Sequence, residues 1–154
     1  GSLRALGQIA PPFKLTGADL ADVGLERFKG KKKILNIVPS LDTEVCAMSA
    51  RHFNEQAGKR NDTVLLNISA DLPFAQKRFC DSQKLEHIVT LSTMRSPGFG
   101  KDYGVAIVDG PLAGLLSRAV LVLDAGNKVV YHEQVPEITQ EPDYPAALAA
   151  LEQV

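Results

Sequence analysis

Short apolar runs alternate along this chain with longer stretches whose apolar positions recur every three or four residues. The run 31–40, KKKILNIVPS, is rich in β-forming residues and reaches Pro39, which predicts a buried strand. The spacing then changes, and the small or apolar positions at helical intervals are Cys46, Ala50, Phe53 and Ala57. Side chains so spaced share one face of a helix, which we expect to end near Gly58.

The same two patterns repeat further along the chain. Residues 63–71, TVLLNISAD, predict a second buried strand, and residues 87–93, HIVTLST, a third, shorter one. Between them, DLPFAQKRFC at 71–80 begins a short helix, with Asp71 expected as its N-cap and Pro73 in its first turn.

The last third combines a loop, a hairpin and a helix. Residues 97–117 are glycine-rich and predict a loop with one helical turn. Two β-branched runs within 118–135 flank the turn residues 124–127, which predicts a hairpin, and the alanine-rich segment 141–154 predicts a closing helix. This order of elements indicates a mixed sheet flanked by helices, as in a thioredoxin-like α/β fold. No internal repeat or linker divides the chain, so we expect residues 1–154 to form a single domain.

The composition argues against binding to nucleic acid and against a membrane-spanning segment. The chain has 154 residues, of which 17 are basic and 18 acidic, so no basic excess favours nucleic acid. The apolar run 119–123 is far too short to span a membrane, and the first residues lack the apolar core of a secretory signal. We therefore expect a cytoplasmic protein, with the periplasm left open if a targeting segment has been removed before Gly1.

The first cysteine, Cys46, is a candidate reactive residue. Cys46 falls in the first turn of its predicted helix, where free N–H groups and the helix dipole favour an anionic, nucleophilic thiolate. The hydroxyl of Thr43 can reach a thiolate or a bound oxygen, and Pro39 can shield the sulfur without offering a competing donor. The alternatives are a small buried cysteine, and Thr43 and Asp42 serving only as capping residues.

The second cysteine, Cys80, lies on a different predicted helix, so the pair is not a C-x-x-C centre. A permanent structural disulfide between Cys46 and Cys80 is one alternative, worth about 3.8 kcal/mol from chain entropy. If the two cysteines instead join only during turnover, one of the two helices must loosen, because disulfides need Cα atoms within about 7 Å.

These residues also carry a family resemblance. Pro39, Thr43 and Cys46 spell P-x-x-x-T-x-x-C, the active-site motif of peroxiredoxins. The fuller stretch NIVPSLDTEVCAMSARHFN resembles the bacterial thiol peroxidase branch, the atypical two-cysteine peroxiredoxins. Three later segments also resemble that branch, so the likeness extends over residues 10–151: SADLPFAQKRFC, YGVAIVDGPLAGLLSRAVLVLD and EITQEPDYPAAL.

The resemblance implies a role for each matching residue. Cys46 corresponds to the peroxidatic cysteine, which attacks the peroxide and becomes a sulfenic acid. The hydroxyl of Thr43 would hold the thiolate and the peroxide, Pro39 would shield the pocket, and Arg118 corresponds to the active-site arginine. Cys80 corresponds to the resolving cysteine, which forms an intramolecular disulfide with Cys46.

The resemblance further implies a peroxiredoxin-type fold and a thiol-dependent peroxidase that serves antioxidant defence. Its substrates would be hydrogen peroxide and alkyl hydroperoxides, thioredoxin would recycle it, and it would form a homodimer without cofactor or metal. The histidines His52, His87 and His132 are scattered, and we expect surface or helix residues there rather than ligands. One departure is that the N-terminal β-hairpin usual in this branch would be shortened or absent here.

Two other classes of protein share parts of this pattern. A redox sensor or chaperone would use the same reactive cysteine to relay oxidation. A thioredoxin-fold binding or metallochaperone module would carry a structural disulfide, but the chain lacks the Cys/His cluster expected of a copper-binding relative.

Overall fold

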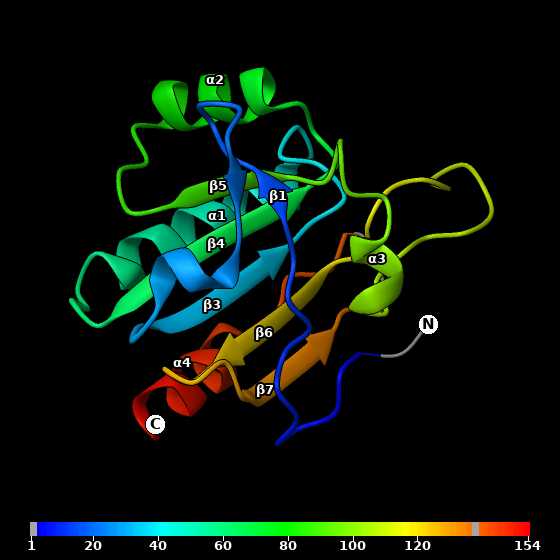
Figure 1. Cartoon of the computed structure of the whole chain (residues 1–154). Coiled ribbons are helices and arrows are strands. Elements are labelled where there is room, and N and C mark those ends of the chain that lie inside the picture. The colour runs from blue at the N-terminus through cyan, green and yellow to red at the C-terminus, as the bar shows by residue number, and fades with distance from the viewer. Residues whose placement is uncertain (1–2, 137–138) are drawn as a thin grey trace.

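The computed structural model describes residues 3–136 and 139–154, and within these ranges the strands form one mixed sheet (Figure 1). The strand order is β2-β1-β5-β4-β3-β6-β7. The strands are β1 (Leu15–Thr16), β2 (Asp22–Val23), β3 (Lys32–Ile37), β4 (Thr63–Ser69), β5 (Val89–Ser92), β6 (Ala119–Leu123) and β7 (Val129–Gln134). The helices are the 3₁₀ helix η1 (Leu25–Phe28) and α1 (Glu44–Ala57), α2 (Pro73–Gln83), α3 (Phe99–Asp102) and α4 (Tyr144–Glu152).

The strand directions bring several loops to one edge of the sheet. Strands β3, β4 and β5 are parallel, whereas β6 runs antiparallel to β3 and β7 antiparallel to β6. The carboxyl ends of β3, β4 and β5 therefore share an edge with the start of β6. The segments that contain Pro39, Asp71 and Arg118 all leave or enter the sheet at this edge.

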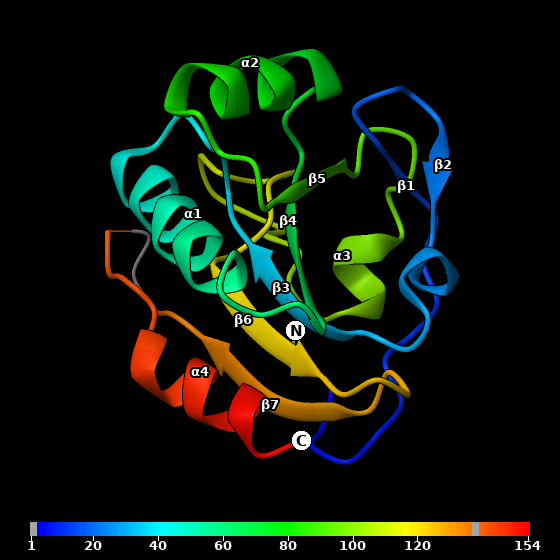
Figure 2. The ribbon, with the colours of Figure 1, turned by 90° about the vertical axis from the view of Figure 1, so that its left-hand side faces the viewer.

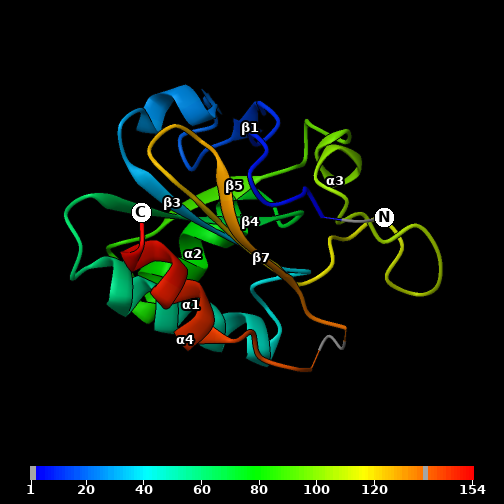
Figure 3. The same cartoon turned by 90° about the horizontal axis from the view of Figure 1, so that it is seen from below.

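Alternating side chains divide the core between the two faces of the sheet. Ile34 of β3 packs with Phe53 of α1 and Leu151 of α4, whereas the next residue, Leu35, packs in the cluster that contains Phe99 of α3. Helices α1, α2 and α4 accordingly lie on one side, and α3 with the N-terminal segment on the other (Figures 2 and 3). This two-sided burial confirms the predicted thioredoxin-like α/β fold.

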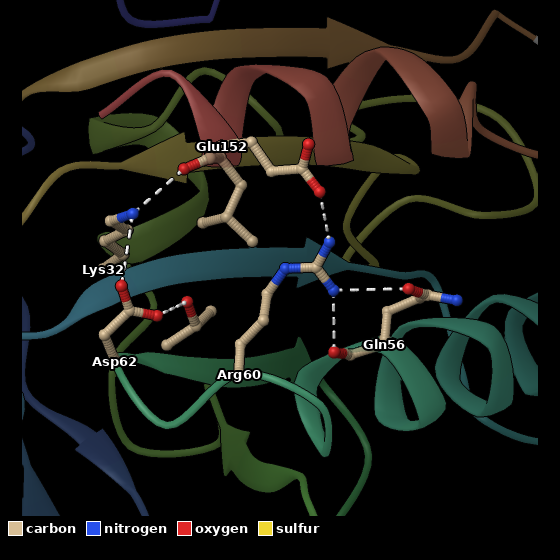
Figure 4. Close-up of polar contacts among 7 residues, drawn as sticks. Lys32, Gln56, Arg60, Asp62 and Glu152 are labelled. Atoms are coloured by element: carbon tan, nitrogen blue, oxygen red, sulfur yellow. Dashed lines mark hydrogen bonds and ion pairs between the residues drawn. The ribbon is translucent and has the colours of Figure 1, made fainter.

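Polar contacts close the opposite edge of the sheet (Figure 4). The Nζ atom of Lys32 lies 3.2 Å from a carboxylate oxygen of Asp62 and donates to the carbonyl of Leu151 at 3.3 Å. Arg60, just after α1, donates to the carbonyl of Gln56 and to the carboxylate of Glu152, both at 2.9 Å. These contacts join the end of α1 to the end of α4, and the end of α4 to β3, at the edge away from Pro39.

Most predicted elements are confirmed, including the apolar face of α1 and its end at Gly58. The sequence patterns did not predict β1, β2 or η1. The two strands have only two residues each, and β1 joins the main sheet through a distant pairing of Thr16 with Ser92. The N-cap prediction for Asp71 was wrong. Leu72 occupies the N-cap of α2 and makes no side-chain cap, because the carboxylate of Asp71 binds the loop before α1 instead.

No helix within the described ranges is long and apolar enough to cross a lipid bilayer. The three histidines lie apart from one another. His52 stacks on Tyr144 with ring centroids 4.0 Å apart, His87 is exposed, and the Nδ1 atom of His132 lies 2.8 Å from the carbonyl oxygen of Arg4.

Candidate active site

The first turn of α1 holds Cys46 in a dry environment. Thr43 is the N-cap residue, with extended backbone, and Cys46 is the third residue of the helix. The Cys46 side chain is fully buried and belongs to a small apolar cluster with Val38, Leu41 and Ala50. A sulfur at this position lies beside the N–H groups that α1 leaves without helical partners, which favour negative charge.

The hydroxyl of Thr43 does not cap α1, although Thr43 is the N-cap residue. Its Oγ1 atom donates to the carbonyl oxygen of Ser40 at 3.0 Å, and it accepts no hydrogen bond from the first turn of α1. The N–H groups of that turn are therefore left to the site rather than satisfied by the cap. Pro39, which precedes this turn, is buried and has no N–H to donate.

Arg118 reaches the same edge from β6. Ala119 pairs with Ile37, so in this antiparallel register Arg118 comes level with the residue that leads into Pro39. Arg118 is 2% exposed, and its backbone carbonyl accepts a hydrogen bond from the N–H of Val135 at 2.9 Å. A permanently charged guanidinium is thus held inside the protein, on a residue whose backbone lies opposite the start of the loop that precedes α1.

The Arg118 charge also acts on Tyr144, the first residue of α4. Burial raises the pKa of the Tyr144 phenol, a hydrogen bond to Glu141 adds to the increase, and the charge of Arg118 opposes it. Tyr144 packs in turn against His52 and Phe53 of α1. The start of α4 therefore connects the arginine with the helix that bears Cys46.

Cys80 lies on α2 as a free thiol, like Cys46. Burial, and to a smaller extent the charge of Asp81, raise the pKa of Cys80 to about 11. The neighbouring Phe79 packs against the apolar cluster that contains Cys46, so the two cysteine-bearing helices are in contact. Only Pro73 and Gln76 are buried in α2, both near its start, so the turns that carry Cys80 are less firmly packed.

A buried chain of polar groups reaches Cys46 from the centre of the sheet. Asn36 of β3 pairs in register with Asn67 of β4, and its Nδ2 donates to the Oδ1 of Asn67 at 2.8 Å and to the hydroxyl of Ser49 at 3.3 Å. The hydroxyl of Ser49 donates to the carbonyl of Cys46 at 3.0 Å. Sequence patterns did not identify these residues, although asparagines inside apolar strands were a visible signal.

Two surface hollows open on the start of α1. One of about 780 Å³ lies between α1 and α2 and includes Thr43 and Phe79 in its lining. The other, of about 530 Å³, is lined by Thr43, Glu44, Val45, Met48, Thr139 and Glu141. Because Thr43 lines both, a small molecule that enters either hollow arrives beside the turn that covers Cys46.

Similarity to known proteins extends over nearly the whole chain. The family model described as Redoxin matches residues 5–148. The thiol peroxidase of Mycobacterium tuberculosis is 54% identical over 151 residues, which cover 98% of this chain and 90% of that protein. A peroxiredoxin-like protein from Aquifex aeolicus is 36% identical with a TM-score of 0.91, and the match covers 100% of this chain and 90% of that one. A thiol peroxidase from Chromobacterium violaceum is 28% identical with a TM-score of 0.92, and that match covers 99% and 89%. This chain therefore belongs to the Redoxin family and, within it, to the thiol peroxidases.

Proposed function

We propose that this thiol peroxidase reduces hydrogen peroxide and alkyl hydroperoxides at Cys46, as part of antioxidant defence. The observation that carries the proposal is the position of Cys46, fully buried in the first turn of α1 at the same sheet edge as the buried Arg118. A reactive thiolate needs this kind of electropositive surrounding.

In the first step, the Cys46 thiolate attacks one peroxide oxygen in line with the O–O bond. The S–O bond forms as the O–O bond breaks, and the alkoxide or hydroxide that leaves takes up a proton. Fixed donors placed where negative charge grows are usually the largest catalytic contribution. Arg118 supplies such donors, Thr43 orients the peroxide with its hydroxyl, and Pro39 keeps water from the sulfur.

In the second step, the Cys80 thiol attacks the sulfenic sulfur of Cys46, and water leaves as the disulfide forms. Cys46 is fully buried and the Cys80 thiol is held protonated, so this step requires a loosened structure. The weak burial of α2 beyond Gln76 favours opening of the turns that bear Cys80, and the first turn of α1 must open as well to expose the buried Cys46 sulfur.

A dithiol protein would then reduce the Cys46–Cys80 disulfide, and we propose thioredoxin for this role. The enzyme would act as a homodimer of single-domain chains, each spanning residues 1–154. We assign it to the bacterial cytoplasm, where reductants keep disulfides transient, and keep the periplasm as the alternative.

A coupled assay tests the proposal through NADPH consumption with thioredoxin, thioredoxin reductase and cumene hydroperoxide. Cys46→Ser should abolish turnover. Cys80→Ser should complete one turnover and stop at a sulfenic acid, which a dimedone-type probe labels on Cys46. Equal activity of the two variants would refute the assignment of roles. Rapid peroxide reduction that thioredoxin cannot sustain would instead favour a redox sensor that passes oxidation to another protein.

A further inference from the structure

The carboxylate of Asp71 binds the loop that leads into α1. Its Oδ1 accepts a hydrogen bond from the Ser40 hydroxyl at 2.7 Å, and its Oδ2 accepts from the Leu41 N–H at 2.8 Å and from the Ser69 hydroxyl at 2.8 Å. The Ser40 oxygen in turn accepts from the N–H of Asp42 at 3.1 Å. One carboxylate thus orders consecutive residues of the loop between β3 and α1.

Asp71 is itself fixed to the sheet. Its carbonyl accepts from the hydroxyl of Ser92 at 2.6 Å, and its N–H donates to the hydroxyl of Ser69 at 3.3 Å. The Nε2 atom of the buried Gln76 donates to Ser69 and to the carbonyl of Leu91, both at 3.0 Å. Asp71 is therefore anchored to the ends of β4 and β5, and through Ser69 to the first turn of α2.

We propose that Asp71 is a positioning residue for the peroxidase reaction, and that its bonds to Ser40 and Leu41 form a latch that controls the opening of the Cys46 turn. The proposal rests on the roles given above to Cys46 and Cys80. Thr43, the N-cap of α1, binds the carbonyl of Ser40 through both its hydroxyl, at 3.0 Å, and its N–H, at 3.3 Å. Holding Ser40 thus holds Thr43, and opening the first turn of α1 requires the latch to break.

The latch consequently influences a competition at the oxidised sulfur. In the closed form, the Cys46 sulfenate can attack a second hydroperoxide, so that another S–O bond forms, an O–O bond breaks, and a sulfinate and an alcohol result. In the open form, the Cys80 thiol attacks the same sulfur and water leaves. A latch that favours the closed form speeds peroxide reduction and increases overoxidation relative to disulfide formation.

The test compares how Cys46 divides between sulfinate and disulfide, which we call the partition, in the wild type, Asp71→Ala and Asp71→Asn. Intact-mass spectrometry gives the fraction of Cys46 sulfinate during turnover as the hydroperoxide concentration is raised. We expect the concentration that overoxidises half of the enzyme to rise about tenfold in Asp71→Ala, the scale of one lost hydrogen bond to a charged group. The rise should be smaller in Asp71→Asn, which keeps one acceptor oxygen. Stopped-flow measurement should show slower first-step oxidation of Cys46 in both variants.

Asp124→Ala is the matched control. Asp124 also orders a loop with its carboxylate, which accepts from the N–H groups of Gly126 and Lys128 at 2.9 Å, but in the β6–β7 turn at the opposite edge of the sheet. Its removal should cost stability without changing the partition. If Asp71→Ala does not fold, Ser40→Ala removes one bond of the latch and should shift the partition in the same direction.

The outcomes separate this inference from the proposed function. A wild-type protein that forms neither disulfide nor sulfinate with peroxide would contradict the roles of the cysteines. The latch alone would be overturned if the wild-type protein forms the disulfide and is recycled, while folded Asp71 or Ser40 variants divide Cys46 between sulfinate and disulfide as the wild type does. An equal shift in Asp124→Ala would also overturn it, because general destabilisation would then explain the effect.

Discussion

The thiol of Cys80 should be far less reactive in the folded protein than its chemistry alone suggests. Burial, with a contribution from Asp81, raises its pKa from 9.0 to about 11. At pH 8, a thiol with a pKa of 9.0 is about one-tenth thiolate, and one with a pKa of 11 about one-thousandth. Because the thiolate is the nucleophile, the reactive population of Cys80 in the folded state is about a hundredfold smaller, and the higher nucleophilicity of a more basic thiolate offsets only part of this loss.

Iodoacetamide alkylation of the Cys46→Ser variant measures this directly, because Cys80 is then its sole cysteine. Rates between about pH 7 and 10.5 should keep rising without levelling off, whereas the same protein unfolded in urea should level off near the ordinary thiol pKa. Asp81→Asn should recover only part of the difference, because burial is the larger cause. Equal rates in the folded and unfolded protein would refute the reasoning.

The shift also has a consequence for stability. Since the folded-state pKa of Cys80 is raised, its contribution to the stability of α2 is fully present below about pH 9 and is lost as pH rises towards 11. Disulfide formation in the wild type should therefore accelerate in this window, as α2 opens more readily. A stopped-flow pH series with one equivalent of peroxide checks this dependence.

Four further substitutions probe other parts of the structure. Arg118→Ala should slow stopped-flow oxidation of Cys46 about a hundredfold, since it removes fixed donors from the site, and an unchanged rate would exclude Arg118 from the reaction. Burial lowers the pKa of Lys33, whose Nζ donates to Asn127 at 2.6 Å, so the folded state disfavours its charge. The wild type should therefore gain stability relative to Lys33→Met as pH rises towards 10.5, and urea titrations that show a constant difference would contradict this. Phe53→Ala should reduce the free energy of unfolding by about 3–5 kcal/mol, because Phe53 is fully buried between α1 and the sheet. Arg60→Ala, at a partly exposed ion pair, should cost under about 1 kcal/mol in the same urea titration.

Local patterns in the sequence predicted the parts of this protein that depend on neighbours in the chain. The helical spacing from Cys46 to Ala57 specified the buried face of α1, and the two β-branched runs around 124–127 specified the β6–β7 hairpin. Both follow from side-chain periodicity, which a chain carries before it folds. The same reasoning placed Cys46 in a first helical turn, where the structure has it.

Only the tertiary structure decided which distant groups meet. Asp71 looked like an N-cap because Asp is common there, yet its carboxylate binds Ser40 and Leu41, about thirty positions away in the chain. Arg118 reached the Cys46 edge through the antiparallel register of β6 with β3, and Asn36 came to face Ser49 through the packing of α1 on the sheet. Hydrogen bonds such as these leave no periodic trace in the sequence, because their partners become neighbours only when the sheet assembles.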